Sequence, residues 1–260
     1  MKKLHPPIGW VGGKSLLRDD IINLIPTHNT YVEVFAGAAW VFFGKEPSKV
    51  EVINDINGDL VNLFRTIKNK PEEFHDALWY MFPSRQLHKM SKELLESSEG
   101  ILTDTERAVL FYYQIKNAFG AKYGAGYAVT KARPPRSAIG MDTLIELQAR
   151  LSQTHIENLP FDRLIRNYDQ PSSFFYLDPP YVVADGKDHY QFTFDEQKHT
   201  LLRDLLAASK GKWLLSYDDV PLIRGLYKDH TIRKTKAIRY SLNSKGERGA
   251  TRHELLISNY

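Results

Sequence analysis

Four short, mostly apolar segments constrain this chain most. β-Branched and aromatic residues dominate all of them, at positions 31–35, 50–53, 174–177 and 213–217. Such segments are typical of strands in a parallel sheet whose two faces are both covered by helices. Helical patterns separate them at 15–25, after a capping Asn57, at 105–117 and at 195–209. This alternation predicts an α/β fold with a doubly wound sheet.

The alternation stops between residues 57 and 140. This stretch is mostly helical at first and then becomes rich in glycine and basic residues. We therefore expect an inserted domain at 57–140, with residues 1–56 and 141–260 together forming the main domain. Near the end of the chain, residues 231–240 and 254–260 are expected to pair as two strands around a polar loop.

Composition excludes several classes of protein. The 260 residues contain no cysteine, which excludes disulfides, zinc fingers, iron–sulfur clusters and cysteine nucleophiles. No apolar run approaches the ~18–20 residues needed to span a bilayer, so we expect no membrane partner and a cytoplasmic location. None of the nine histidines begins a His-x-Asp pair, and Ile257 replaces the second histidine of a zinc motif that would begin at His253. We expect no metal.

Positive charge is concentrated in two parts of the chain, residues 107–141 and residues 232–260. Residues 107–141 contain no Asp or Glu, and basic residues alternate there with aromatic ones. Cations for phosphates and flat rings for bases are what a nucleic-acid surface needs. We expect residues 111–115 to belong to a helix core, and a basic hairpin at about 119–136 to contact the polyanion. The candidate DNA contacts are Lys122, Tyr123, Lys131, Arg133, Arg136, Lys245, Arg248 and Arg252.

The run Leu177-Asp178-Pro179-Pro180-Tyr181 ends a predicted buried strand. In open α/β sheets, ligand sites form at this end of the strands. Two acceptors, a carboxylate and the carbonyl of a rigid proline turn, could hold both N–H groups of an adenine N6 and free its lone pair. The aromatic ring could stack on the base, which must leave a duplex to be reached. The alternative is a stiff turn in which Asp178 caps and Tyr181 packs.

Residues 31–40 predict a strand, a turn of small residues and a helix. Only Gly37 stands where a dinucleotide fingerprint needs three glycines, so that motif is excluded. Asp55 ends the next strand 18 residues after Gly37, where an acid can bind ribose hydroxyls. The alternative is that Asp55 caps the following helix.

A third candidate motif is Trp10-Val11-Gly12-Gly13-Lys14-Ser15. It is no phosphate-binding loop, because Ile8 replaces the required glycine and no strand precedes it. Backbone N–H groups and the Lys14 ammonium could instead hold a carboxylate. The alternative is a plain turn with a solvated lysine.

Together these motifs resemble the Dam-type DNA adenine-N6 methyltransferases over nearly the whole chain. The glycine motif precedes the Asp-Pro-Pro-Tyr motif, and the DNA-recognition region lies between them. The resemblance implies a Rossmann-like, class I methyltransferase-type sheet, S-adenosyl-L-methionine as methyl donor and double-stranded DNA as partner. We expect a monomer, which would suffice, with a dimer as the alternative. It implies catalytic roles for Asp178, Pro179, Pro180 and Tyr181. It implies that the cofactor pocket is lined by Trp10, Gly12, Lys14, Phe35, Gly37, Asp55 and Asp178.

The chain departs from this family at three places. Ala39 replaces the second glycine of the Phe-x-Gly-x-Gly motif. Family members that read GATC carry an Asn-Gly-x-x-Arg run, and here that run reads Asn117-Ala-Phe-Gly-Ala121, without the arginine. A lysine that some members carry before the Trp-x-Gly-Gly-Lys run is Gly9 here. We therefore expect recognition that is looser than, or different from, GATC.

Two alternatives to DNA adenine methylation remain at this point. The first is the same chemistry on RNA or on a protein amide, although many amide-directed enzymes carry Asn at the position of Asp178. The second is a DNA-binding relative without activity, which predicts damage at Asp178, Tyr181 or Asp55. None of these three is changed.

Overall fold

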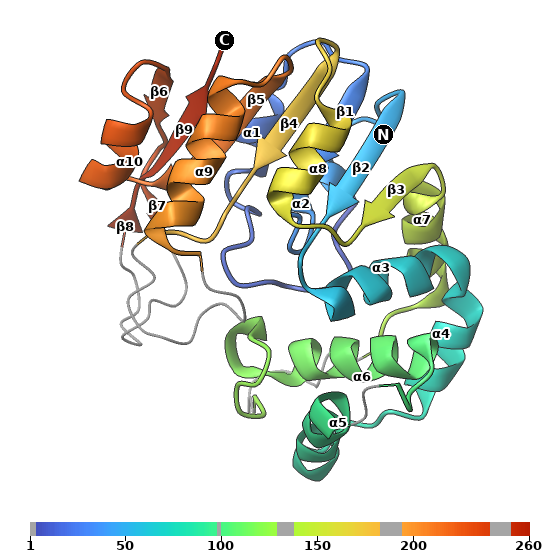
Figure 1. Cartoon of the computed structure of the whole chain (residues 1–260). Coiled ribbons are helices and arrows are strands. Elements are labelled where there is room, and N and C mark those ends of the chain that lie inside the picture. The colour runs from blue at the N-terminus through green and yellow to red at the C-terminus, as the bar shows by residue number, and fades with distance from the viewer. Residues whose placement is uncertain (1–3, 98–99, 129–137, 183–193, 240–250) are drawn as a thin grey trace.

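Seven strands form one sheet in the computed structural model, in the order β3-β2-β1-β4-β5-β9-β6 (Figure 1). The structure describes residues 4–97, 100–128, 138–182, 194–239 and 251–260. The sheet strands are β1 (Thr30–Glu33), β2 (Val50–Asn54), β3 (Thr154–Glu157), β4 (Ser173–Leu177), β5 (Lys212–Asp218), β6 (Thr231–Lys234) and β9 (Glu254–Ser258). A second, two-stranded sheet pairs β7 (Ile238–Arg239) with β8 (Thr251–Arg252).

Strands β1 to β5 are parallel to one another, whereas β9 runs antiparallel to both β5 and β6. The chain winds from β1 to β2 and β3 on one side, and then from β4 to β5 on the other. The order therefore reverses between β1 and β4. This confirms the predicted doubly wound α/β sheet, including the terminal strand pair β6 and β9.

Both faces of the sheet are buried, as the apolar strands predict. Alternate residues of a strand point to opposite faces. Tyr31, Phe174 and Tyr176 therefore join one hydrophobic cluster, while Val32 and Phe175 join the other. All of these side chains are at most 1% exposed. Consequently the described part of the sheet offers polar side chains mainly at or near the ends of its strands.

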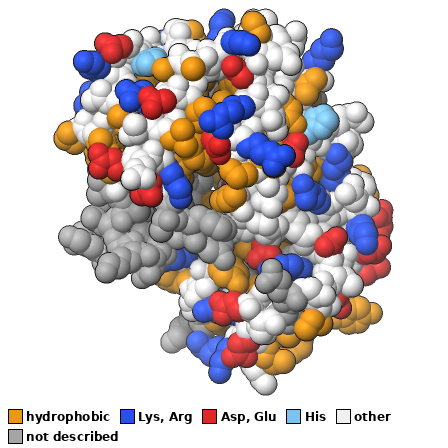
Figure 2. All heavy atoms as spheres, in the orientation of Figure 1, with side chains coloured by type: hydrophobic (Ala, Val, Ile, Leu, Met, Phe, Trp, Pro, Cys, Tyr) orange, Lys and Arg blue, Asp and Glu red, His pale blue; other side chains and the backbone are white. Residues whose placement is uncertain are grey.

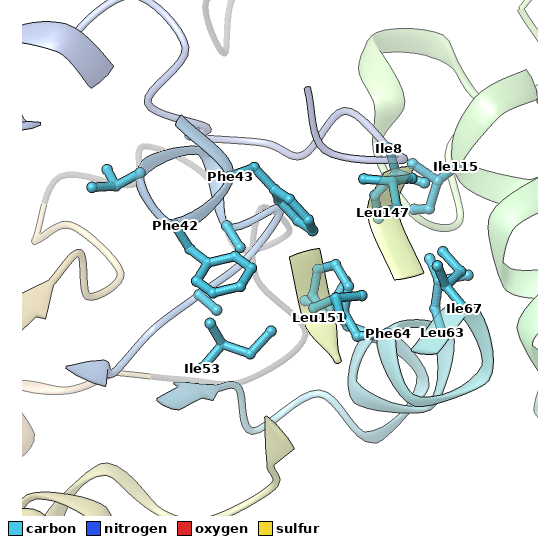
Figure 3. Packing of buried hydrophobic residues seen from close by; sticks show 14 of the residues in the cluster. Ile8, Phe42, Phe43, Ile53, Leu63, Phe64, Ile67, Ile115, Leu147 and Leu151 are labelled. Atoms are coloured by element: carbon cyan, nitrogen blue, oxygen red, sulfur yellow. The ribbon is translucent and has the colours of Figure 1, made fainter. Parts of the chain in front are cut away.

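Helices cover the two faces separately. The first cluster is packed by α1 (Arg18–Ile22), α2 (Trp40–Gly44), α3 (Gly58–Asn69) and α7 (Met141–Leu151). The second is packed by α8 (Phe161–Tyr168), α9 (Glu196–Ala207) and α10 (Pro221–Leu226). Figure 3 shows part of the first cluster, where Phe42 and Phe43 meet Phe64 and Leu151.

The described residues of the stretch 57–140 are mostly helical up to residue 121, as predicted. After α3 come α4 (Pro71–Trp79), α5 (Arg85–Ser97), α6 (Asp104–Asn117) and the short 3₁₀ helix η1 (Phe119–Ala121). Helices α4 to α6 extend beyond the end of the sheet (Figure 1). Residues 111–115 are buried in α6, which confirms the helix core expected there. The first cluster runs without a break from the sheet to α6, and the domain boundary at 57 and 140 stays a prediction.

Two expected helices differ from the observed ones. The helix expected at 15–25 is reduced to α1, residues 18–22, because residues 15–17 form turns. These turns follow Lys14, whose side chain is paired with Asp178. In α9 a four-leucine buried stripe is expected from the sequence, but only Leu202 and Leu206 are fully buried, and Leu201 is 39% exposed. One side of this helix meets the sheet, so the buried residues are three or four apart, at His199, Leu202 and Leu206. Asn57 caps α3 as expected, accepting from the N–H groups of Asp59 and Leu60.

Among the described residues, no helix is long and apolar enough to cross a bilayer.

Candidate active site

A cavity of about 350 Å³ opens at the carboxyl ends of β1, β2 and β4. This is the point where the strand order reverses, and ligands in doubly wound sheets bind there. The volume lies in the range of small-molecule sites. The wall combines the ends of these strands with two loops, residues 10–14 and 121–123. Of the cofactor residues predicted from the sequence, Trp10, Gly12, Lys14, Phe35, Gly37, Asp55 and Asp178 all line this cavity.

Gly37 has two reasons to be glycine. Its φ of +48° lies in the left-handed region, which favours residues without a side chain. A Cβ at this position would also lie 2.8 Å from Cδ1 of Trp10. The turn after β1 is thus packed directly beneath the tryptophan ring. Ala39, where the family motif has its second glycine, is also left-handed with a φ of +59°, and the chain accepts that strain at the start of α2.

Asp55 ties the ends of β1 and β2 together. Its Oδ2 accepts a hydrogen bond of 2.9 Å from the N–H of Gly37, and its Oδ1 accepts one of 2.9 Å from the N–H of Asn57. Burial raises the pKa of this carboxyl, and these backbone donors partly oppose the rise. The helix cap itself is Asn57. Asp55 does not cap the helix, but it accepts a hydrogen bond from the capping residue.

The Trp10–Gly13 segment is a β-turn closed by a 3.0 Å hydrogen bond from the N–H of Gly13 to the carbonyl of Trp10. Gly12 sits at its third position with a φ of +78°, which a type II turn requires. The Lys14 side chain is buried, and its ammonium engages the chain's own carboxyl groups. The solvated lysine of the alternative interpretation is therefore wrong.

Asp178 follows β4 and lies in a cluster of polar groups. Its Oδ2 is 2.7 Å from Nζ of Lys14, and its Oδ1 is 2.8 Å from Oγ of Ser216. Burial raises the pKa of Asp178, the nearby Glu254 adds to the rise, and the Lys14 ammonium opposes it. Lys14 therefore helps to keep a buried carboxyl ionised.

The three residues after Asp178 take different positions. Pro179 is buried, and Pro180 lines the cavity. Tyr181 is half-buried, with its ring centroid 4.9 Å from Nζ of Lys14 and its hydroxyl donating a 2.7 Å hydrogen bond to Oε2 of Glu254. The motif thus places a carboxyl, a proline turn and an oriented ring together at one edge of the sheet.

Few of the predicted DNA contacts can be placed. Lys122 and Tyr123 line the cavity, and the Tyr123 ring stacks on Phe111 at 5.8 Å between centroids. Residues 117–128 begin a hairpin, since Phe119 N–H donates to the carbonyl of Gly126 and Ala128 N–H to that of Asn117. Lys131, Arg133, Arg136, Lys245 and Arg248 lie outside the described residues, as does the side chain of Arg252. On the described part of the face in Figure 2, acidic and basic side chains are interspersed.

Comparison with known proteins decides the family. Residues 10–241 match the D12 class N6 adenine-specific DNA methyltransferases. The chain belongs to this family.

Similar proteins span nearly the whole methyltransferase. The chain is 30% identical to the type II methyltransferase M1.LlaDCHI of Lactococcus lactis subsp. cremoris, and the match covers 99% of this chain and 96% of that one. It is 28% identical to the type II methyltransferase M.CviBI of Paramecium bursaria Chlorella virus NC1A, over 99% and 100%. It is 27% identical to the DNA adenine methylase of Escherichia coli K12, over 95% and 92%.

Sequence reasoning missed three residues of this methyltransferase's site. Ser216 and Glu254 contact the Asp178 cluster, and Glu33 lines the cavity with its carboxyl buried beneath α2. Glu33 Oε2 accepts from the Tyr31 hydroxyl at 2.7 Å and from the N–H of Phe42 at 2.9 Å. Burial raises the pKa of Glu33 to about 8, against these hydrogen bonds. For Glu33, the signal in the sequence was a single charged residue inside an otherwise apolar strand.

Around this methyltransferase site, and elsewhere in the described residues, no group of three or more His, Cys, Asp or Glu side chains is placed to hold a metal ion.

Gly37→Ala should destabilise the methyltransferase by about 1–2 kcal/mol, because alanine must adopt the left-handed conformation and displace the Trp10 ring. Urea unfolding of both proteins measures the difference. Gly225→Ala is the matched control, since Gly225 lies in α10 with open space around its Cβ position. That control should be neutral or slightly stabilising. Equal stability of Gly37→Ala and wild type would contradict the assigned constraint.

Glu33 should make the folded methyltransferase less stable at alkaline pH. The pKa of Glu33 in the folded protein is about 8, above the ordinary value of 4.5. Its contribution to the free energy of unfolding is therefore fully present below pH 4.5 and is lost as the pH rises through about 8. Glu33→Gln keeps both hydrogen-bond acceptor roles without the titration. Between pH 6 and 9, the wild type should therefore lose more unfolding free energy than Glu33→Gln. The exposed Glu72→Gln serves as control and should follow the wild type.

Proposed function

We propose that this methyltransferase transfers the methyl group of S-adenosyl-L-methionine to N6 of an adenine flipped out of double-stranded DNA. The observation that carries the proposal is that one cavity joins Asp55, at the end of β2, to Asp178, at the end of β4. A donor bound against the first would thus present its methyl group beside the second. One copy of the chain supplies both, so a monomer suffices.

The residues of the cavity fit this donor. S-Adenosyl-L-methionine carries a sulfonium and an ammonium group, and two aspartate side chains line the cavity, Asp55 and Asp178. Gly37 keeps the backbone clear of side chain where the donor would lie, and the Asp55 carboxyl is placed for ribose hydroxyls. Phe35 offers an aromatic face in the same wall. When bound, the donor supplies an electrophilic methyl group.

Asp178 and the proline turn would activate the target nitrogen. The lone pair of adenine N6 is delocalised into the ring, which makes it a poor nucleophile. The Asp178 carboxylate accepts one N6–H and the Pro179 carbonyl accepts the other, which favours a pyramidal nitrogen with its lone pair free. The Tyr181 ring stacks on the flipped base and faces it towards the methyl group.

This role requires an ionised Asp178. Burial raises the pKa of Asp178 above the ordinary value. As the pH is lowered, methyl transfer should therefore be lost at a higher pH than it would be with an aspartate of ordinary pKa. The Lys14 ammonium limits that loss by favouring the charged form.

Asp178→Ala should abolish methyl transfer and leave DNA binding nearly unchanged, because phosphates are held elsewhere. Removing an electrostatic group that acts in the transition state costs roughly 10²–10³-fold in rate. Labelled donor incubated with duplexes of several sequences, followed by analysis for N6-methyladenine, measures it. The exposed Asp229→Ala is the matched control and should keep wild-type activity. A wild-type protein that is folded yet labels no adenine would overturn the proposed function.

We propose that residues 57–140, and above all the hairpin at 119–136, recognise the DNA. The hairpin starts beside the cavity, and its described part carries the exposed Phe119, at 61%, and Lys122. Acidic residues are absent from 107–141, so the segment offers phosphates no repulsion. Phosphate contacts of this kind position DNA without selecting a sequence.

Recognition should be looser than, or different from, GATC. The two positions at which the chain departs from GATC-reading relatives face each other, since a Cβ on Gly9 would lie 3.1 Å from Cβ of Ala121. Neither position offers a side chain that can form the two hydrogen bonds by which arginine reads guanine, worth roughly 1–3 kcal/mol of discrimination. Mapping every methylated adenine of a plasmid tests this. Methylation confined to GATC would refute the prediction.

A single consensus other than GATC would instead assign base reading to another residue of the hairpin. Arg133→Ala and Arg136→Ala then show which one reads it. Binding that weakens equally on all sequences indicates a phosphate contact, with a salt slope lower by about 0.9 log unit.

A further inference from the structure

Glu254 reaches the catalytic edge of the sheet because β9 runs against its neighbours. The parallel strands end at this edge, whereas β9 begins there, and Glu254 is paired with Asp218 at the end of β5. Its backbone is fixed on both sides of the residue. The N–H of Glu254 donates to Oγ1 of Thr235 at 2.9 Å, and its carbonyl accepts from the N–H of Thr235 at 2.9 Å.

The Glu254 side chain is only 3% exposed and faces the Asp-Pro-Pro-Tyr turn. Its Oε2 accepts the 2.7 Å hydrogen bond from the Tyr181 hydroxyl and lies 3.8 Å from Nζ of Lys14. The same Nζ is 2.7 Å from Asp178. Glu254 therefore contacts the ring assigned to the target base and the cation assigned to the catalytic carboxyl.

A buried carboxyl here is costly for folding. Removing an acid from water is unfavourable unless charges and hydrogen bonds compensate it, and Lys14 must already compensate Asp178. An apolar residue would fill this position more cheaply and would leave the Tyr181 ring packed near Tyr217, 6.0 Å away between centroids. An apolar residue could not accept the hydrogen bond from the Tyr181 hydroxyl, and it could not interact with the Lys14 ammonium together with Asp178.

We propose that Glu254 is a positioning residue for methyl transfer. It holds the Tyr181 ring in place through the tyrosine hydroxyl, and it fixes the position of the Asp178 carboxyl through Lys14. The inference rests on the proposed function. It extends that function by naming what orients the stacking ring and the acceptor. Glu254 itself touches neither the base nor the donor in this role.

The role has an electrostatic consequence that a merely structural residue would lack. The titratable groups that act on Asp178 or are acted on by it are Lys14, Glu33, Tyr176, Tyr217 and Glu254. The Glu254 charge raises the pKa of Asp178. Removing that charge should therefore extend methyl transfer to lower pH.

Three variants separate the two contacts of Glu254. Glu254→Gln keeps an acceptor for the Tyr181 hydroxyl but removes the charge, Glu254→Leu removes both, and Tyr181→Phe keeps the ring but removes the hydroxyl. Each is assayed on a duplex that the wild type methylates, for kcat, KM and the affinity for S-adenosyl-L-methionine. Displacement of reacting groups by about 1 Å costs up to 10²-fold in rate.

We expect Glu254→Leu to lower kcat by roughly 10–100-fold, with donor affinity unchanged. Glu254→Gln should retain more activity than Glu254→Leu, and the acid limb of its kcat profile should move to lower pH. Tyr181→Phe should leave that limb in place. The double variant Tyr181→Phe with Glu254→Leu should lose less than the product of the two single losses, because both remove the same hydrogen bond.

Multiplicative losses, or an acid limb that Glu254→Gln does not move, would overturn the proposal. If Glu254→Leu does not fold, the Glu254→Gln profile and its double variant with Tyr181→Phe decide in its place. A wild type without any methyl transfer contradicts the proposed function instead. An active wild type with an unaffected Glu254→Gln contradicts only the role of Glu254.

Discussion

Burial of both sheet faces determines where this protein can do chemistry. Each parallel strand is covered by one hydrophobic cluster on either side, so most of the polar side chains of the described sheet lie at or near the strand ends, where backbone and side-chain partners can satisfy them. Asn54 illustrates the rule. Its amide donates to the carbonyls of Val34 and Leu159, and its oxygen accepts from the N–H of Leu159. One side chain thus joins the ends of β1, β2 and β3 and holds the cavity wall in place.

At that edge, the electrostatics depend on one ammonium group. Asp178 and Glu254 both lie within 4 Å of Lys14 Nζ, at 2.7 and 3.8 Å. The Glu254 charge raises the pKa of Asp178, and the Lys14 ammonium opposes that rise. The short turn at Gly12 and Gly13 delivers this lysine from the N-terminal segment. That delivery explains why residues 15–17 form turns instead of extending α1.

Sequence patterns were sufficient for the features that local rules determine. The apolar strands, the Asn57 cap and the carboxyl groups at the ends of β2 and β4 follow from periodicity, capping and strand order, and the structure confirms their positions. Glu254 and Ser216 did not follow, because each is placed by pairing between distant segments. The pairing of β9 with β5 places Glu254, and the pairing of β5 with β4 places Ser216 beside Asp178. Glu33 was missed because a lone acid in a strand normally faces solvent, whereas this one is 2% exposed beneath α2. Strand β3 is short and carries polar residues on its partly exposed side, so its pattern resembled a loop.

The cavity and the recognition segment share one wall, and this contact gives the departures at Gly9 and Ala121 a common physical basis. Trp10 lies against Phe111 at 6.1 Å, and Tyr123 stacks on the same ring. The turn that holds the donor cavity and the hairpin assigned to DNA are therefore packed on one residue of α6. Gly9 precedes the first and Ala121 precedes the second, and they are close enough that a Cβ on Gly9 would crowd Ala121. A longer side chain at either position must find room against the other. We therefore expect any substitution that restores base reading here to involve both positions, while Asp178, Lys14 and Tyr181 are held by contacts at the sheet edge.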